Sequence, residues 1–231
     1  MVLRLMIVLF TSQILQITAS GDQKQQTTTA QQEPDGKSLI PRVPLQEVLP
    51  FLQSYQDIHL QMITLEDWNN LRCECVKSRF QARHNGGCER TLHCYTWVKV
   101  SMRETMVREE GWVDFQAVQV DGFTSVDLKK IVGIEPTEER PEELPHSYVV
   151  AKVAQECMLV TYGQSTDGQQ KCLLWGLSGN HVSTDTECYK ALKSICPDDM
   201  YDMTESDGPC LHYDRYEDSR NNIGQEDEET H

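Results

Sequence analysis

The chain lacks an excess of positive charge, and it lacks long apolar runs after its N-terminus. It carries 21 lysines and arginines against 36 acidic residues, which gives a formal net charge of -15. Nucleic acids and anionic lipid surfaces attract proteins through cationic patches, so this charge balance argues against both as partners. No later stretch approaches the about 20 apolar residues that a membrane-spanning helix needs. The sequence therefore favours neither a nucleic-acid-binding nor a membrane-spanning protein.

Patterns of known catalytic and metal sites are also missing. The segment Gly176-Leu177-Ser178-Gly179-Asn180 has the Gly-x-Ser of a nucleophile elbow without its closing glycine. The seven histidines show no His-x-x-x-His spacing. The acidic residues from Asp198 to Glu205 lack the glycine and the terminal glutamate of a calcium loop. We therefore predict a protein that is not an enzyme and that needs no metal or cofactor.

Residues 1–20 have the pattern of an export signal. Arg4 supplies the positive charge, a mostly apolar run follows it, and Thr18-Ala19-Ser20 offers small residues for cleavage before Gly21. The alternative is an N-terminal membrane anchor, but the apolar run is short for spanning a bilayer. We expect a secreted, extracellular protein with no membrane association after the signal is removed.

The chain contains an odd number of cysteines, nine in all. An exported chain meets oxidising conditions, in which cysteines pair and each bridge contributes about 2–4 kcal/mol. A zinc cluster around Cys73, Cys75, His84, Cys88, His93 and Cys94 is therefore a weaker interpretation than disulfides. One thiol must stay free, be capped or pair with another chain, so a disulfide-linked dimer is an open alternative. The nine are Cys73, Cys75, Cys88, Cys94, Cys157, Cys172, Cys188, Cys196 and Cys210.

Composition divides the rest of the chain into a leader, one domain and a tail. Residues 21–43 begin with a Gln/Thr-rich stretch without apolar periodicity, which predicts a disordered leader. Residues 213–231 end in a strongly acidic stretch, and we interpret them as a solvated, disordered tail. Residues 44–212 remain as a single domain.

Within this domain, periodicity predicts helices at both ends and strands between them. Apolar residues from Leu49 to Met62 follow nearly helical spacing, so one or two short helices are expected over residues 44–68. A helix starting at Thr184 or Asp185 should run through Cys188 to Cys196 and stop at Pro197. The predicted strands are Arg90–Val100, Gly111–Val120, Ser147–Val153, Cys157–Tyr162 and Lys171–Leu177. Many short strands linked by turns imply an antiparallel sandwich or a closed barrel.

The cysteine spacing of the C-terminal half resembles that of tick salivary lipocalins, the histamine-binding protein family. The resemblance lies in Glu156-Cys157-Met158-Leu159-Val160, Lys171-Cys172-Leu173-Leu174-Trp175, Cys188-Tyr189, Cys196, Tyr201-Asp202 and Cys210. Trp68 and Gly87-Cys88 also fit. The resemblance implies a mainly β fold: an eight-stranded antiparallel lipocalin barrel with an N-terminal helix and a disulfide-linked C-terminal helix.

The resemblance also implies three disulfides and leaves three cysteines without a family counterpart. The implied pairs are Cys88 with Cys210, Cys157 with Cys188, and Cys172 with Cys196. Of the other three, Cys73 and Cys75 would share a strand face, so one of them could reach Cys94 on the neighbouring strand.

Two positions depart from the pattern of amine-binding relatives. Those relatives carry acidic residues where this chain has Met158 and Leu173. A protonated amine buried without a carboxylate faces a desolvation cost of several kcal/mol, whereas these side chains suit an apolar ligand. We therefore predict a carrier that sequesters a small hydrophobic host mediator (a fatty acid, eicosanoid or sterol) and so modulates host inflammation or immunity. The predicted ligand-binding residues are Trp97, Trp112, Phe115, Tyr148, Met158, Leu173 and Trp175.

Two alternatives remain open from the sequence. The first is an immune modulator that binds a host protein through the barrel loops, with the barrel as a scaffold. The second is a histamine or serotonin binder whose carboxylates are displaced to Glu156 or Asp114.

Overall fold

The computed structural model describes residues 40–71, 73–100, 103–132, 146–164, 168–177, 182–206 and 210–215. The expected export signal, the leader up to residue 39 and the tail from residue 216 lie outside the described residues. The elements in chain order are α1 (Leu45–Leu52), β1 (Ile58–Thr64), α2 (Leu65–Leu71), β2 (Cys73–His84), β3 (Gly87–Val100), β4 (Arg103–Val120), β5 (Phe123–Val132), β6 (Ser147–Val153), β7 (Cys157–Gln164), β8 (Gln170–Leu177), α3 (Glu187–Ile195), β9 (Met200–Asp202) and a 3-10 turn (Met203–Ser206).

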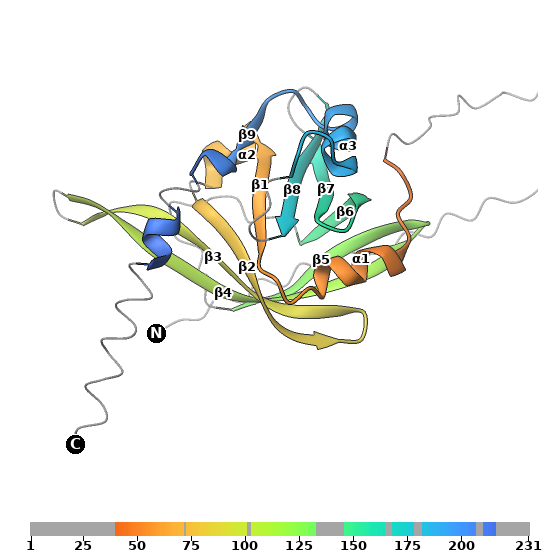
Figure 1. Ribbon diagram of the computed structural model, residues 1–231, viewed down its shortest axis with the longest axis horizontal. Coiled ribbons are helices and arrows are strands. Elements are labelled where there is room, and N and C mark those ends of the chain that lie inside the picture. The colour runs from red at the N-terminus through yellow and green to blue at the C-terminus, as the bar shows by residue number, and fades with distance from the viewer. Residues whose placement is uncertain are drawn as a thin grey trace, which may run out of the picture. The chain divides into compact units, whose positions relative to one another are not determined.

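Strands β1 to β8 form a closed antiparallel barrel. Each strand from β2 to β7 pairs with the next strand in the chain, and β1 pairs with both β8 and β2, so the ring closes. The short strand β9 adds to the far half of β1, beside α2 (Figure 1). With α1 at the N-terminal side and α3 bound by disulfides, this architecture confirms the fold that the lipocalin resemblance implies.

The predicted strands are found, all but Ser147–Val153 with extended bounds, but the helical prediction over residues 44–68 is partly wrong. Two short helices form there, yet Ile58–Thr64 between them is strand β1. A register irregularity between Leu60 and Met62 places apolar residues at uneven intervals, which imitates helical spacing in the sequence. Cross-strand pairing on both sides of β1 decides its conformation.

Helix α3 packs on the outer wall of the barrel against β6, β7 and β8 (Figure 1). It begins after Thr186, whose hydroxyl accepts a hydrogen bond from the Tyr189 amide at 3.3 Å, rather than after Thr184 or Asp185. Leu192 and the outward-facing Leu159 are both almost fully buried in this contact. Strand β7 therefore has apolar residues on both faces, because the barrel interior covers one face and α3 the other.

Disulfides join α3 to the wall as expected, through Cys157–Cys188 and Cys172–Cys196. Cys73 pairs with Cys94, which is one of the two partners considered for Cys94.

The expected Cys88–Cys210 bridge is wrong, because Cys210 pairs with Cys75. Cys75 has a φ of 56°, and the β2–β3 register slips between Glu74 and Lys77. This bulge turns Cys75 away from the face of Cys73 and into a separate cluster with Tyr95 and Cys210. The expectation that Cys73 and Cys75 share a face fails for the same reason.

Cys88 is the unpaired cysteine, and it is fully buried. Its thiol donates a hydrogen bond to the Leu52 carbonyl at 3.0 Å. A thiol in this position does not reach another chain, so the structure gives no support to a dimer linked through the odd cysteine.

The packed domain extends slightly past the expected limits of residues 44 and 212. Before it, Val43 is buried and its carbonyl accepts a 2.6 Å hydrogen bond from the Thr124 hydroxyl. After it, a helical turn over residues 210–215 places Tyr213 and Asp214 against Tyr95.

Candidate ligand-binding site

The barrel contains a cavity of about 140 Å³ to which all eight strands and α1 contribute. Its polar lining residues are Ser78, Arg90, His93 and Glu109, and the Cys73–Cys94 bridge also borders it. The remaining lining residues are Phe51, Leu52, Ile58, Leu60, Ile63, Val76, Leu92, Phe115, Val126, Leu128, Tyr148, Met158, Val160, Leu173 and Trp175. The wall is thus mainly aliphatic and aromatic with a few polar groups, as in small-molecule sites.

Five of the seven predicted ligand-binding residues lie on this wall: Phe115, Tyr148, Met158, Leu173 and Trp175. Met158 stands opposite Trp175 across β7 and β8, and Leu173 stands opposite Val160. Met158 and Leu173 therefore belong to one apolar wall in this chain.

Trp97 and Trp112 do not lie on the wall, and their placement in the ligand site is corrected. Their side chains are 55% and 50% exposed. Successive side chains of a strand point to opposite faces, and Trp112 is out of phase with the cavity residue Phe115. On β3, Trp97 is out of phase with Arg90, Leu92 and Cys94, and it is not among the lining residues.

The carboxylates considered for a displaced amine site are also absent from the wall. Glu156 is exposed in the bend before β7. Asp114 lies at 2.8 Å from Nε2 of His84 and is not among the lining residues.

A different carboxylate, Glu109, lines the cavity and accepts a 2.7 Å hydrogen bond from the Thr96 hydroxyl. The sequence prediction missed it because the predicted strand began at Gly111, whereas β4 begins at Arg103. Alternation back from Phe115 would have placed Glu109 on the inner face.

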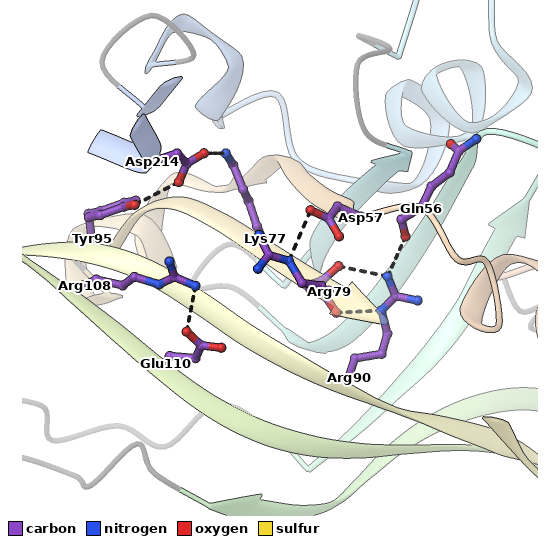
Figure 2. A network of polar contacts seen from close by, with 10 residues as sticks. Gln56, Asp57, Lys77, Arg79, Arg90, Tyr95, Arg108, Glu110 and Asp214 are labelled. Atoms are coloured by element: carbon purple, nitrogen blue, oxygen red, sulfur yellow. Dashed lines mark hydrogen bonds and ion pairs between the residues drawn. The ribbon is translucent and has the colours of Figure 1, made fainter. Parts of the chain in front are cut away.

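The guanidinium of Arg90 closes the cavity beside the C-terminal end of α1. Arg90 is 1% exposed, and all five of its N–H groups donate hydrogen bonds. Nε donates to the Ser78 hydroxyl at 2.9 Å, and Nη2 donates to the Ser78 carbonyl at 2.9 Å and to the Gln56 carbonyl at 2.7 Å (Figure 2). Nη1 donates to the carbonyls of Leu52 at 3.0 Å and Ser54 at 2.8 Å. The side chain thus joins the segment after α1 to strand β2.

Burial dominates the titration of the groups around this contact. Desolvation lowers the pKa of Arg90 from its usual value, although Cys88 and Asp57 oppose the shift. It also raises the pKa of the Cys88 thiol to about 11, against the influence of the Arg90 charge. Cys88 is therefore a neutral thiol at physiological pH, and a neutral thiol is a poor nucleophile.

At the other end of the barrel, α2 places Asp67 against the inward-facing Tyr162. The Tyr162 hydroxyl donates to Asp67 at 2.5 Å, and Nζ of Lys171 donates to the same carboxylate at 2.9 Å. Burial, followed by the hydrogen bond to Asp67, raises the pKa of Tyr162. Tyr162 in turn contacts the ring of the wall residue Tyr148, with 5.3 Å between the ring centroids. This network fixes one side of the cavity wall.

A second polar network binds the C-terminal segment to the outer face of β2 and β3. Asp214 forms an ion pair with Lys77 and accepts a 2.8 Å hydrogen bond from the Tyr95 hydroxyl (Figure 2). Burial alone would raise the pKa of Asp214, but the hydrogen bonds from Lys77 and Tyr95 lower it overall. Burial and the charge of Arg108 lower the pKa of the nearby His93 to about 3, so its imidazole is neutral.

The size of the cavity limits what it accepts without rearrangement. Pockets for drug-sized ligands measure about 300–1,000 Å³, and a cavity of about 150 Å³ accommodates benzene. The cavity of about 140 Å³ is thus suited to a small apolar group as it stands. A longer ligand requires wall side chains to move, and Met158 is the most adaptable of them because methionine is unbranched.

Neither a metal site nor a membrane-spanning helix is found in the part of the chain that the structure describes. No group of three or more His, Cys, Asp or Glu residues has a metal-binding arrangement there. None of the described helices is both long enough and apolar enough to cross a membrane.

The chain thus forms an antiparallel barrel that encloses a mainly apolar cavity. No protein-family model matches the chain, and no curated protein matches it. Among solved structures, the chain is similar to Japanin from Rhipicephalus appendiculatus bound to cholesterol. The two share 15% sequence identity with a TM-score of 0.47, over 65% of this chain and 93% of that one.

Proposed function

We propose that this protein is an exported, lipocalin-type carrier that sequesters a small hydrophobic ligand of the fatty acid, eicosanoid or sterol class in its barrel. The observation that carries the proposal is the cavity wall, on which Met158, Leu173 and Trp175 join a continuous apolar lining. The four disulfides support export, because such bridges persist in oxidising compartments. The resemblance to salivary lipocalins extends the proposal to removal of a host inflammatory or immune mediator.

The four tryptophans allow a specific test, because only one of them lines the cavity. Trp175 lies on the wall, Trp97 and Trp112 are about half exposed, and Trp68 stacks on Tyr201 with a centroid distance of 4.2 Å. We expect a bound apolar ligand to change the emission of Trp175. Titration with arachidonate and cholesterol should therefore give a saturable signal that is lost in Trp175→Phe.

The matched controls are Trp97→Phe and Trp112→Phe, which should keep the ligand-dependent signal. Binding of the same ligands to Trp175→Phe is then followed by calorimetry, which separates loss of signal from loss of affinity. A signal that survives Trp175→Phe but disappears in Trp97→Phe would place the ligand outside the barrel. If no small molecule binds by either method, a protein partner becomes the better hypothesis.

A biogenic amine is the second candidate, and the position of Glu109 favours it. Its carboxylate is the acidic group on the cavity wall and would stabilise a protonated amine. Its carboxylate also accepts the 2.7 Å hydrogen bond from the Thr96 hydroxyl. Histamine or serotonin binding that is lost in Glu109→Gln would support this candidate over the apolar carrier.

A further inference from the structure

The charge of Arg90 has no carboxylate counterpart within ion-pair distance among the described residues. Its five hydrogen bonds go to neutral acceptors, namely four carbonyl groups and one hydroxyl. The neighbouring acid, Asp57, lies 3.7 Å from Nε of Arg79 instead (Figure 2). Buried charges in proteins are usually paired, so a buried cation beside a cavity, without an ion-pair partner among the described residues, favours an anion there.

Ser78 supplies the hydrogen-bond donor through which this charge acts on the cavity. It is 3% exposed and lines the cavity, and its oxygen accepts the 2.9 Å hydrogen bond from Nε of Arg90. Within the described residues its own hydroxyl proton has no acceptor. A hydroxyl that accepts from a cation is polarised, so it is a stronger donor to a second acceptor.

The opposite end of the cavity carries the opposite charge. Glu109 stands opposite Cys94 across β3 and β4, four residues along β3 from Arg90. At about 3.3 Å per residue, the two ends lie about 13 Å apart along the strand. Between them the lining is apolar, with Leu92, Val160 and Leu173 among its residues. An acidic ligand group is attracted to the Arg90 end and repelled by the Glu109 end.

We propose that the ligand is a monocarboxylate with an apolar chain, whose carboxylate accepts the hydrogen bond of Ser78 beside Arg90. The chain lies along the apolar wall towards Glu109, so the acid binds with its head at the end closed by α1. This inference rests on the proposed carrier function and names the ligand class and its orientation.

The test compares ligands that share an eight-carbon chain and differ only in the head group. Octanoate, methyl octanoate, 1-octanol and octylammonium are titrated into the full exported chain by calorimetry, with Trp175 emission as a second readout. We expect octanoate to bind about tenfold more tightly than the ester and the alcohol, and octylammonium to bind most weakly. Octanoate is chosen because its short chain demands the least expansion of the cavity.

Variants at Ser78 assign the effect to this site. Ser78→Ala should weaken octanoate binding by about five- to tenfold and 1-octanol binding by about twofold or less, because the lost hydrogen bond is charge-assisted only for the acid. Ser78→Thr keeps the hydroxyl and should restore the preference for the acid. Ser194→Ala, on the exposed face of α3, is the control and should change neither affinity. Urea denaturation of each variant verifies that it folds.

Each outcome separates this inference from the proposed function. Equal affinity for all four ligands, or a preference for octanoate that Ser78→Ala leaves intact, overturns the inference while the carrier function stands. Tightest binding of octylammonium also overturns it and assigns the head group to Glu109. Absence of binding by every ligand, including arachidonate and cholesterol, overturns the carrier function itself.

Discussion

The hydrogen bonds of Arg90 lead to a quantitative prediction about stability. Arg90→Met retains much of the apolar stem but removes all five donors. The carbonyls of Ser54 and Gln56 lie near the surface and can bind water instead, so loss of the hydrogen bonds from Arg90 to them costs little. The bonds to Leu52 and Ser78 are buried, and three such bonds at about 1–1.5 kcal/mol each give a loss of about 3–5 kcal/mol.

Urea denaturation followed by circular dichroism measures this loss, which is a large part of the about 5–15 kcal/mol that stabilises a typical domain. Arg90→Lys keeps the charge with three donors, so its loss should be intermediate. Arg79→Met, on the neighbouring strand with an exposed ion pair, is the control and should cost less than about 1 kcal/mol. Hydrogen exchange should be accelerated most in α1. A change below about 1 kcal/mol for Arg90→Met would refute the assignment of Arg90 as the contact that fixes α1 to the barrel.

Three further predictions concern the cysteines and the C-terminal segment. Cys88 should not react with a thiol reagent at pH 8 in the native protein, because it is buried and its pKa is about 11. Unfolding without reductant should then expose one reactive thiol per chain. A thiol signal from the native protein would contradict the burial of Cys88. Asp214→Asn should cost about 1–3 kcal/mol at pH 7. The pKa of Asp214 is lower in the folded protein than in the unfolded chain, where it is about 3.9. The stabilisation by Asp214 is therefore complete above the unfolded pKa and disappears as the pH falls through the folded pKa. A stability difference between the two proteins that does not depend on pH would contradict this prediction. Replacing Cys75 and Cys210 by alanine opens a loop with a sequence separation of 135. The free energy of unfolding, measured by urea denaturation, should fall by up to about 5 kcal/mol. A fall below about 1 kcal/mol would show that other contacts hold the C-terminal segment to the barrel.

Local sequence patterns predicted the strands that turn residues border and the helix that carries cysteines at helical spacing. Strand β6 has the predicted bounds, and β7 and β8 differ only slightly, because turn residues border each apolar run. Helix α3 and its two bridges followed from helical spacing of cysteines and the resemblance. Met158 and Leu173 lie on the cavity wall, and the sequence pointed to them only through the family pattern.

The remaining features depend on contacts between distant segments. The bulge at Cys75 changes which cysteine reaches Cys210, and its left-handed backbone has no signature in a non-glycine residue. Trp97 and Trp112 were chosen by residue type, although strand phase decides which face they occupy. Arg90 is in phase with Leu92 and Cys94, so its inward position could have been read from the sequence. Its contacts with the carbonyls of Leu52, Ser54 and Gln56 could not, because those residues lie more than 30 positions away in the sequence.

The distribution of the disulfides has a mechanical consequence. The bridges join β2 to β3, β2 to the C-terminal turn, and β7 and β8 to α3, whereas β4, β5 and β6 contain no cysteine. Within the described residues, β5 and β6 share three register pairs, Ser125–Val149, Val126–Tyr148 and Asp127–Ser147. The barrel thus has a cross-linked side and a side held by hydrogen bonds and packing alone. No disulfide crosses the seam between β5 and β6, and Val126 and Tyr148, which form one of its register pairs, line the cavity, so a ligand larger than the cavity meets there a wall without a cross-link.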